Sequence, residues 1–269
     1  MRKCCPLAAL IVLACFLVSE SLAKQVPREN FHLFLLVGQS NMAGRGKVAD
    51  QDRKPHPRVL MLTKDNKWFP AVDPIHFDKK VAGVGLGKTF GIQMAGANSK
   101  VRIGLIPCAA GGSPIDSWKP GGYHGQTRSH PYDDAIKRAR LAMKGGVLKG
   151  ILWHQGESDS KTGKAEVYEK KLHEVIARFR KDLNAPNVPF IAGQMGQFKE
   201  RPWSDAKKLV DKAHRELPKK VSRCAFVGSD ELKHKGDKVH FDAKSMREFG
   251  KRYAAVYLKL VSEKKSKSR

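Results

Sequence analysis

The sequence has few acidic residues, few cysteines and no internal repeat. Its 24 Gly, 14 Pro and 5 Cys are scattered without a period among 269 residues, which excludes a collagen-like chain and a disulfide-rich scaffold. Only 26 Asp and Glu stand against 51 Lys and Arg. Hydrophobic residues make up 41% of the chain, enough to build a core, so the composition argues against intrinsic disorder.

The sequence also lacks the residue spacings of common metal-binding and phosphate-binding motifs. There is no C-x-x-C and no H-E-x-x-H, and the ten His are dispersed, so we expect no metal site and no cofactor. The glycines of residues 83–87 precede Lys88 and Thr89 but do not form the G-x-x-x-x-G-K-[ST] of a phosphate-binding loop. The sequence therefore does not predict a nucleotide-dependent enzyme.

The first 23 residues predict a secretory signal peptide. Arg2 and Lys3 are followed by an apolar run over 6–18 and by Ser-Leu-Ala at 21–23, which offers small residues where signal peptidase cuts. A lipoprotein signal cut before Cys15 is a poorer match. No later run reaches 18 apolar residues, so we expect no stable membrane insertion and a mature protein that is secreted or periplasmic.

The positive charge is the most unusual feature of the composition. Without Arg2, Lys3 and Glu20, which leave with the predicted signal, the formal net charge is +24. Such a field attracts anionic polymers, so a non-catalytic binder of acidic polysaccharide is one hypothesis. Nucleic acid is not an expected partner, because the chain has an export signal and no nucleic-acid motif. Residues 263–269 form a basic tail.

Cys108 and Cys224 are the cysteines of the mature chain. Each lies at the end of an apolar run, which favours buried free thiols. Export also permits a disulfide between them, and the sequence leaves both possibilities open.

Short apolar runs alternate along the chain with patterns typical of amphipathic helices. The runs are nearly continuous in Leu, Ile, Val and Phe, as expected for strands buried on both faces of a parallel sheet. This alternation predicts an α/β fold in a single domain over 24–262, with a mainly parallel sheet of five or six strands covered by helices on both faces. The predicted strands are 31–37, 58–62, 101–106, 148–153, 188–192 and 221–227, and the predicted helices are 89–97, 132–143, 167–183, 205–217 and 243–260.

Polar or glycine-rich turns follow four of these strands, at the edge of a parallel sheet where ligands bind. Ser40 lies in the turn after the first strand, and a serine hydroxyl becomes a nucleophile when a base accepts its proton. His240 is a suitable base, and Asp237, three residues earlier, is placed to orient its imidazole. The N–H groups of Ser40 and Gly111 and the side-chain amide of Gln155 are candidate oxyanion donors.

Other residues near these turns are candidates for supporting roles. Asn41 and Glu157 are expected to support the catalytic groups by hydrogen bonds. Several aromatic residues in loop-like contexts suit either stacking on sugar rings or partial burial under loops. They are Trp68, Trp118, Tyr123 and Trp203, whereas Trp153 ends a strand and is expected in the core.

The segment Gly-Gln-Ser-Asn-Met at 38–42 resembles the nucleophile block of SGNH-type hydrolases. More narrowly, it resembles the sialate O-acetylesterase-like branch, which includes carbohydrate esterase family six. Residues 103–118, 150–159 and 237–241 resemble the other blocks, so the resemblance spans 31–258. It implies a three-layer α/β/α fold of the SGNH, flavodoxin-like type. It also implies Ser40 as nucleophile, His240 as base, Asp237 as orienting acid, and an oxyanion hole of Ser40, Gln155 and either Gly111 or Gly112.

This resemblance implies a secreted carbohydrate O-acetylesterase, a carboxylic ester hydrolase whose partner is an acetylated carbohydrate. Because the chain is closer in size to compact acetylxylan esterases than to longer sialate esterases, acetylated xylan is the expected substrate and acetylated sialic acid the alternative. The basic surface is expected to favour anionic polysaccharide. Leu86 stands where this branch usually carries Pro, a departure that concerns only local loop shape.

Overall fold

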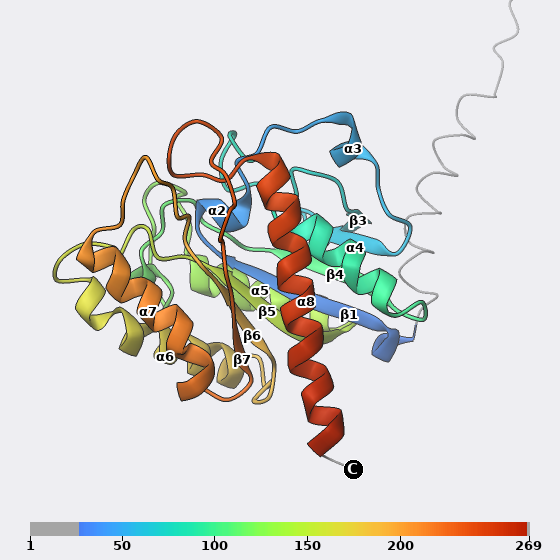
Figure 1. The fold of residues 1–269 in the computed structure, drawn as a ribbon. Helices are drawn as coiled ribbons and strands as arrows, with labels where there is room; N and C mark the ends of the chain where they lie inside the picture. The colour runs from blue at the N-terminus through green and yellow to red at the C-terminus, as the bar shows by residue number, and fades with distance from the viewer. Residues whose placement is uncertain (1–26, 268–269) are drawn as a thin grey trace, which may run out of the picture.

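Seven strands form one sheet in the computed structural model of the protein, which describes residues 27–267. Their order is β3-β2-β4-β1-β5-β6-β7, and neighbouring strands are parallel except for β2 and β3. Helices cover both faces (Figure 1), so the predicted α/β fold is confirmed. The predicted signal lies outside the described residues. The strands are β1 (Phe31–Gly38), β2 (Val59–Leu62), β3 (Trp68–Pro70), β4 (Arg102–Pro107), β5 (Val147–His154), β6 (Phe190–Gly193) and β7 (Cys224–Val227).

The sheet has one strand more than the sequence predicts. β3 pairs antiparallel with β2 at the edge of the sheet, with Trp68 opposite Leu62. It is three residues long and Phe69, its middle residue, is exposed, so no buried apolar run marks it in the sequence. The six predicted strands are all present.

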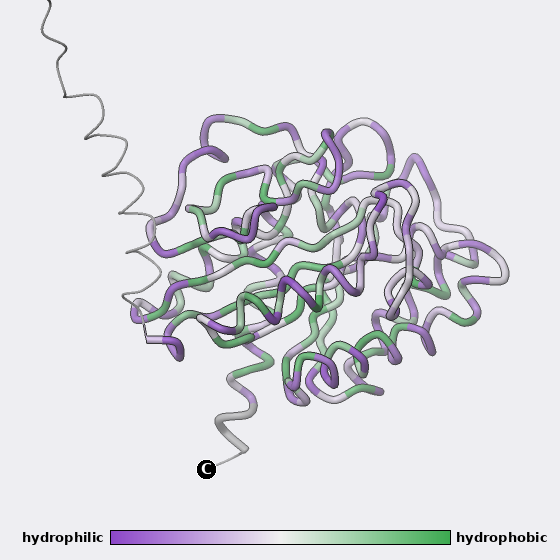
Figure 2. The backbone as a smooth tube through the Cα atoms, turned by 180° about the vertical axis from the view of Figure 1, so that it is seen from behind, coloured by the Kyte–Doolittle hydropathy of each residue, from purple (hydrophilic) through white to green (hydrophobic). Residues whose placement is uncertain are grey.

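Apolar side chains of β1 alternate between two cores. Leu33 and Leu35 pack on the side of α5, α6 and α7, whereas Phe34 and Leu36 pack on the side of α4 and α8. All four are fully buried, and in Figure 2 the strands run mostly green while the outer helices alternate between green and purple. The helices are α2 (Ser40–Ala43), α3 (Asp50–Arg53), α4 (Gly87–Ala97), α5 (Pro131–Met143), α6 (Ala165–Asp182), α7 (Asp205–Lys220) and α8 (Ala243–Lys267), with 3₁₀ turns η1 (Arg28–Asn30) and η2 (Ile115–Ser117).

The two cysteines of the described chain are free thiols. Cys108 follows β4 and Cys224 begins β7, and three strands lie between β4 and β7 in the sheet. Since neighbouring strands are about 4.8 Å apart, a disulfide cannot span this separation. Near the C-terminus, α8 continues through most of the segment that the sequence marks as a basic tail. Within 27–267, no helix combines the length and apolar character needed to cross a membrane.

The order of the strands reverses at β1. The chain builds β2 and β4 on one side of β1 and then β5, β6 and β7 on the other. The loops after β4, β1 and β5 therefore meet at a topological switch point, where open parallel sheets bind ligands. Gly38 ends β1 there with φ of +129°, and a Cβ atom at this position would overlap the carbonyl oxygen of His154. Close contact of the two strands thus requires glycine.

A buried carboxyl group in the loop between β3 and α4 makes stability depend on pH. Asp73 is 3% exposed, and burial raises its pKa to about 7 against the opposing effects of the Gly85 N–H and Lys88. This pKa exceeds the unfolded value near 3.8, so the folded state holds the proton more tightly than the unfolded chain does. The free energy of unfolding therefore falls as the pH rises from about 4 to above 7.

We expect Asp73→Asn to remove this loss, because the amide oxygen can still accept the Gly85 N–H, which lies 3.3 Å from Asp73 Oδ1. Relative to wild type, the variant should gain roughly 1–4 kcal/mol of unfolding free energy between pH 4 and pH 8, measured by urea denaturation at both pH values. Exposed Asp65, changed to Asn, is the matched control. If the difference in unfolding free energy between Asp73→Asn and the wild type were the same at both pH values, the expectation would be contradicted.

Candidate active site

Ser40 lies just beyond the end of β1 and begins α2 at the switch point. Its Oγ is 2.9 Å from Nε2 of His240, and Nδ1 of His240 is 2.7 Å from Oδ2 of Asp237. Ser40 is 200 residues away from His240 in the chain, so only the tertiary fold brings them into contact. The three residues that the sequence singles out therefore form one continuous line of hydrogen bonds. This is the geometry in which an Asp-His pair can accept a serine proton.

Asp237 is held as a carboxylate by a turn of the backbone. Its Oδ1 accepts the N–H groups of Val239 at 3.0 Å and His240 at 2.8 Å. Burial acts to raise the pKa of Asp237, but the hydrogen bonds from the backbone and ring of His240 and from Val239 outweigh it and keep this pKa well below its ordinary value. A carboxylate only accepts hydrogen bonds, so the imidazole proton lies on Nδ1 and Nε2 is left to accept the proton of Ser40.

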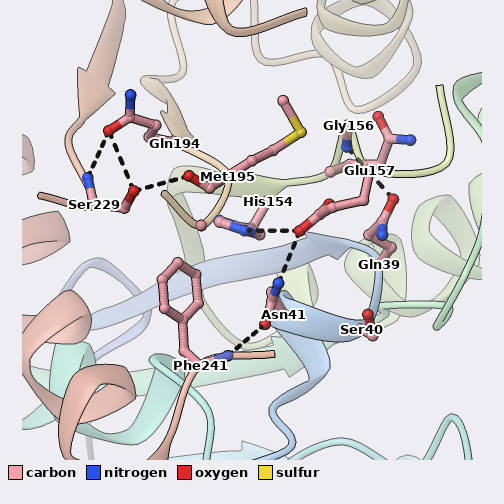
Figure 3. A network of polar contacts seen from close by, with 12 residues as sticks. Gln39, Ser40, Asn41, His154, Gly156, Glu157, Gln194, Met195, Ser229 and Phe241 are labelled. Atoms are coloured by element: carbon pink, nitrogen blue, oxygen red, sulfur yellow. Dashed lines mark hydrogen bonds and ion pairs between the residues drawn. The ribbon is translucent and has the colours of Figure 1, made fainter. Parts of the chain in front are cut away.

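Asn41 connects the nucleophile turn to the loop that carries His240. Its Oδ1 accepts the Phe241 N–H at 3.2 Å and its Nδ2 donates to the Val239 carbonyl at 3.1 Å. These peptide groups flank His240 on its two sides, and Figure 3 shows the contact with Phe241. A single fully buried amide thus sets the position of the base relative to Ser40.

Glu157 holds the same amide from the opposite side (Figure 3). Its Oε1 accepts Nδ2 of Asn41 at 2.8 Å and lies 3.8 Å from Nε2 of His154, the fully buried last residue of β5. Burial acts to raise the pKa of Glu157, but His154 and Asn41 outweigh it and lower the pKa to about 2. Both residues that the sequence suggests as supports therefore contact each other beneath the nucleophile turn.

Two of the three predicted oxyanion donors are engaged elsewhere. The Gly111 N–H donates to Oδ2 of Asp78 at 2.9 Å. The buried Gln155 amide donates to the Ser113 carbonyl at 3.1 Å and to Oδ2 of Asp159 at 2.5 Å, which uses both of its hydrogens. In this structure, therefore, neither of these two predicted donors is free to donate to an oxyanion. Gln155 instead holds the loop after β4 against the loop after β5.

The backbone N–H groups of Ser40 and Gly112, both at the switch point, have no acceptor among the residues that the structure describes. Gly112 has φ of +86°, a left-handed conformation that favours glycine, and its carbonyl accepts Oγ of Ser158 at 2.8 Å. The sequence leaves open whether Gly111 or Gly112 belongs to the oxyanion hole. In the structure the N–H of Gly112 has no acceptor, whereas that of Gly111 does.

Sequence analysis did not single out Gln39, although it precedes the nucleophile in the 38–42 segment. Its side chain is 3% exposed, and its Oε1 accepts the N–H groups of Gly156 and Ser158, each at 3.4 Å. Figure 3 shows the first of these contacts. Gln39 therefore links the turn after β1 to the loop after β5. The only signal for it in the sequence is its place beside Ser40.

The aromatic candidates for sugar stacking divide into three groups. Trp118 is fully buried and meets the ring of Trp153 edge-on at 5.2 Å, so of the two alternatives that the sequence leaves open it is burial that holds, and Trp118 belongs to the core. Trp68 and Trp203 are partly buried and pack against the core. Tyr123 is 58% exposed, which leaves it accessible to a ligand.

The carboxylates at this edge bind protein groups. Asp237 contacts His240, and Glu157 contacts Asn41. In the part of the chain that the structure describes, no three His, Cys, Asp or Glu side chains are grouped to hold a metal ion.

We expect Asn41→Ala to lower kcat by about 10- to 100-fold with little change in KM, because the base loses its fixed position while substrate contacts remain. Steady-state hydrolysis of a small acetyl ester measures both constants. The variant should also lose roughly 1–3 kcal/mol of stability, since the Phe241 N–H and Glu157 lose a buried partner. Asn187→Ala is the matched control, because that side chain is exposed. An unchanged kcat in a folded Asn41→Ala protein would rule out the positioning role.

Comparisons with known proteins agree on one family. Residues 30–259 match the family described as carbohydrate esterase, sialic acid-specific acetylesterase. The chain is 32% identical over 256 residues to a probable carbohydrate esterase of Arabidopsis thaliana, covering 87% of this chain and 93% of that protein.

Solved structures show the same fold. The X-ray structure of the Arabidopsis protein has a TM-score of 0.75 at 33% identity and covers 86% of this chain and 98% of that one. NanS has a TM-score of 0.72 at 18% identity, with 88% and 99% of the two chains covered. A carbohydrate acetylesterase from Xanthomonas citri has a TM-score of 0.64 at 17% identity, with 83% and 55% covered. The last two resemblances concern the fold alone.

Proposed function

Since the chain belongs to the carbohydrate esterase, sialic acid-specific acetylesterase family, we propose that it is a secreted enzyme that removes acetyl groups from acetylated polysaccharide of the xylan type. The observation that carries the proposal is the line of hydrogen bonds from Ser40 through His240 to Asp237. It supplies a nucleophile, a base and an orienting carboxylate at the switch point of the sheet. Export is proposed from the pattern of residues 1–23.

The proposed reaction proceeds through an acetyl-enzyme. Ser40 Oγ attacks the acetyl carbonyl carbon while His240 Nε2 takes the hydroxyl proton, which forms a tetrahedral oxyanion. The intermediate collapses as the C–O bond to the sugar breaks and His240 returns the proton to the sugar oxygen. Water then attacks the acetyl-enzyme with His240 again as base, and acetate leaves from Ser40. Asp237 orients the imidazole and stabilises its positive charge in both halves.

The oxyanion is proposed to bind the N–H groups of Ser40 and Gly112. Both are at the switch point and neither has an acceptor among the described residues, so they can serve the oxyanion without breaking an existing hydrogen bond. Gln155 is given a positioning role, because its amide donates to the Ser113 carbonyl, one residue after Gly112. This assignment replaces the Gly111 and Gln155 donors expected from the sequence.

Acetylated xylan is proposed as the substrate because the chain is closer in size to compact acetylxylan esterases than to longer sialate esterases, and acetate release tests this choice directly. The Arabidopsis relative is described as a carbohydrate esterase, whereas the family description names sialic acid, so acetylated sialic acid is the second candidate substrate. We would measure acetate released by the wild-type protein and by Ser40→Ala from acetylated xylan, from O-acetylated sialic acid and from a small activated acetyl ester.

Each outcome separates the candidates. Release from xylan by the wild type alone supports the proposal. Release only from acetylated sialic acid replaces xylan with sialate as the substrate. Cleavage of the small ester through Ser40 without release from either sugar retains the esterase and rejects both. No turnover on any of the three would favour a non-catalytic binder of acidic polysaccharide.

A further inference from the structure

A cavity of about 480 Å³ opens at the carboxyl ends of β2 and β4. Its wall includes Cys108, Ala109 and Ala110, which lie in the loop that continues to Gly112. The Ala110 N–H donates to the carbonyl of Gly38 at 2.9 Å, so this wall is hydrogen-bonded to the end of β1 just before Ser40. The cavity is within the usual size range of a small-molecule site, about 300–1,000 Å³.

Arg138 brings a buried positive charge into the cavity wall without a carboxylate partner. Its side chain is 8% exposed, and its guanidinium donates to three neutral oxygens. Within the described chain no carboxylate oxygen lies within 4.0 Å of it, and its buried Nε has no hydrogen-bond acceptor. A buried cation without an anion is costly, so the site favours a ligand that brings one. The three oxygens are the carbonyls of Leu62 and Thr63 and Oδ1 of Asn66.

His76 adds a second unpartnered donor to the same wall. It is 5% exposed, and burial lowers its pKa to about 3, so the ring is neutral. Its Nδ1 accepts the Ala109 N–H at 3.4 Å, which places the ring proton on Nε2. This buried Nε2 has no acceptor among the described residues. Both of these N–H groups are buried within the wall itself, so what the wall offers a ligand is the charge of Arg138, which no carboxylate of the described chain neutralises.

Exposed cations line the same cavity. Lys64, Arg128 and Lys137 line the cavity and are all exposed. Two acidic groups also line it: Asp78, which is neutralised by Arg45 at 2.7 Å, and Asp134, which accepts the backbone N–H of His130. The local balance is thus positive, in keeping with the formal charge of +25 for the whole chain.

We infer that this cavity is a subsite for the carboxylate of a uronic acid residue in the acetylated polysaccharide. The unneutralised charge of Arg138 and the exposed Lys64, Arg128 and Lys137 along the cavity would attract and hold the carboxylate. The inference rests on the proposed function, since it places the acidic sugar beside the sugar whose ester reaches Ser40. It also gives the basic charge of the chain a role in selecting substrate.

Calorimetric titration of the full protein with sodium glucuronate, glucose and inorganic phosphate tests the subsite without any hydrolysis. Glucuronate should bind saturably at low ionic strength, and glucose at least about ten times more weakly. The double variant Lys64→Met and Lys137→Met should weaken glucuronate binding by about 3- to 10-fold. Its control, Lys170→Met with Lys259→Met, removes the same charge from exposed positions outside the cavity and should leave binding unchanged.

Arg138→Met should abolish measurable glucuronate binding, and the lysine pair decides the matter if that variant does not fold. The subsite would be overturned if glucuronate and glucose bound with equal affinity. It would also be overturned if both double variants lost the same affinity for glucuronate. Phosphate binding tighter than glucuronate would overturn its assignment to a sugar carboxylate. Hydrolysis of a small activated acetyl ester tests Ser40 separately, so failure of the esterase and failure of the subsite give different results.

Discussion

Ser40→Ala is expected to lower kcat for acetyl ester hydrolysis by about three or more decades. The hydroxyl oxygen is the only atom lost, and it is the atom 2.9 Å from His240 Nε2. Ser40 is 8% exposed, so the methyl group that remains fits the same space and the fold should be retained. The measurement is kcat on a small activated acetyl ester, with acetate release from acetylated xylan as the second readout.

Ser262→Ala is the matched control for this experiment. Ser262 is exposed near the end of α8, and its Oγ donates to the Lys259 carbonyl, so the same atom is removed outside the site. We expect full activity in the control and an unchanged thermal midpoint in both variants. Wild-type activity in Ser40→Ala would reject Ser40 as the nucleophile.

Asp237→Asn should lower kcat by about two to four decades at neutral pH. The asparagine can keep its oxygen at the Oδ1 position, which accepts the N–H groups of Val239 and His240. Its NH₂ group then faces Nδ1 of His240, where the carboxylate oxygen lies at 2.7 Å in the wild type. An NH₂ group donates, so Nδ1 must become the acceptor and the ring proton moves to Nε2. In that tautomer His240 cannot take the proton of Ser40.

Asp205→Asn provides the isosteric control for Asp237→Asn. Asp205 begins α7, its side chain is 94% exposed, and its ion pair with Lys208 is on the surface. It should keep wild-type kcat, because it contacts no residue of the site. If Asp237→Asn and Asp205→Asn had equal activity, Asp237 would have no role in orienting the base.

Most of the sheet follows from the local sequence. The runs of Leu, Ile, Val and Phe mark the six parallel strands because strands buried on both faces must be apolar at nearly every position. β3 lacked such a signal, since an edge strand of three residues with an exposed Phe69 has no pattern of its own. Trp118 lies in a loop-like sequence, but the fold buries it against Trp153, a contact between residues 35 positions apart.

The sequence by itself determined which residues are candidates for catalysis at the carboxyl ends of the strands. Ser40, Asp237 and His240 were identified because a turn after a buried strand and an Asp-x-x-His spacing are local features. Only the tertiary structure decided which hydrogen-bond donors remain free. Asp78 takes the Gly111 N–H across 33 positions of the chain, and long-range contacts of this kind leave no local pattern. That Arg138 is buried without a carboxylate partner also became visible only after folding, because burial and contacts between distant residues are properties of packing.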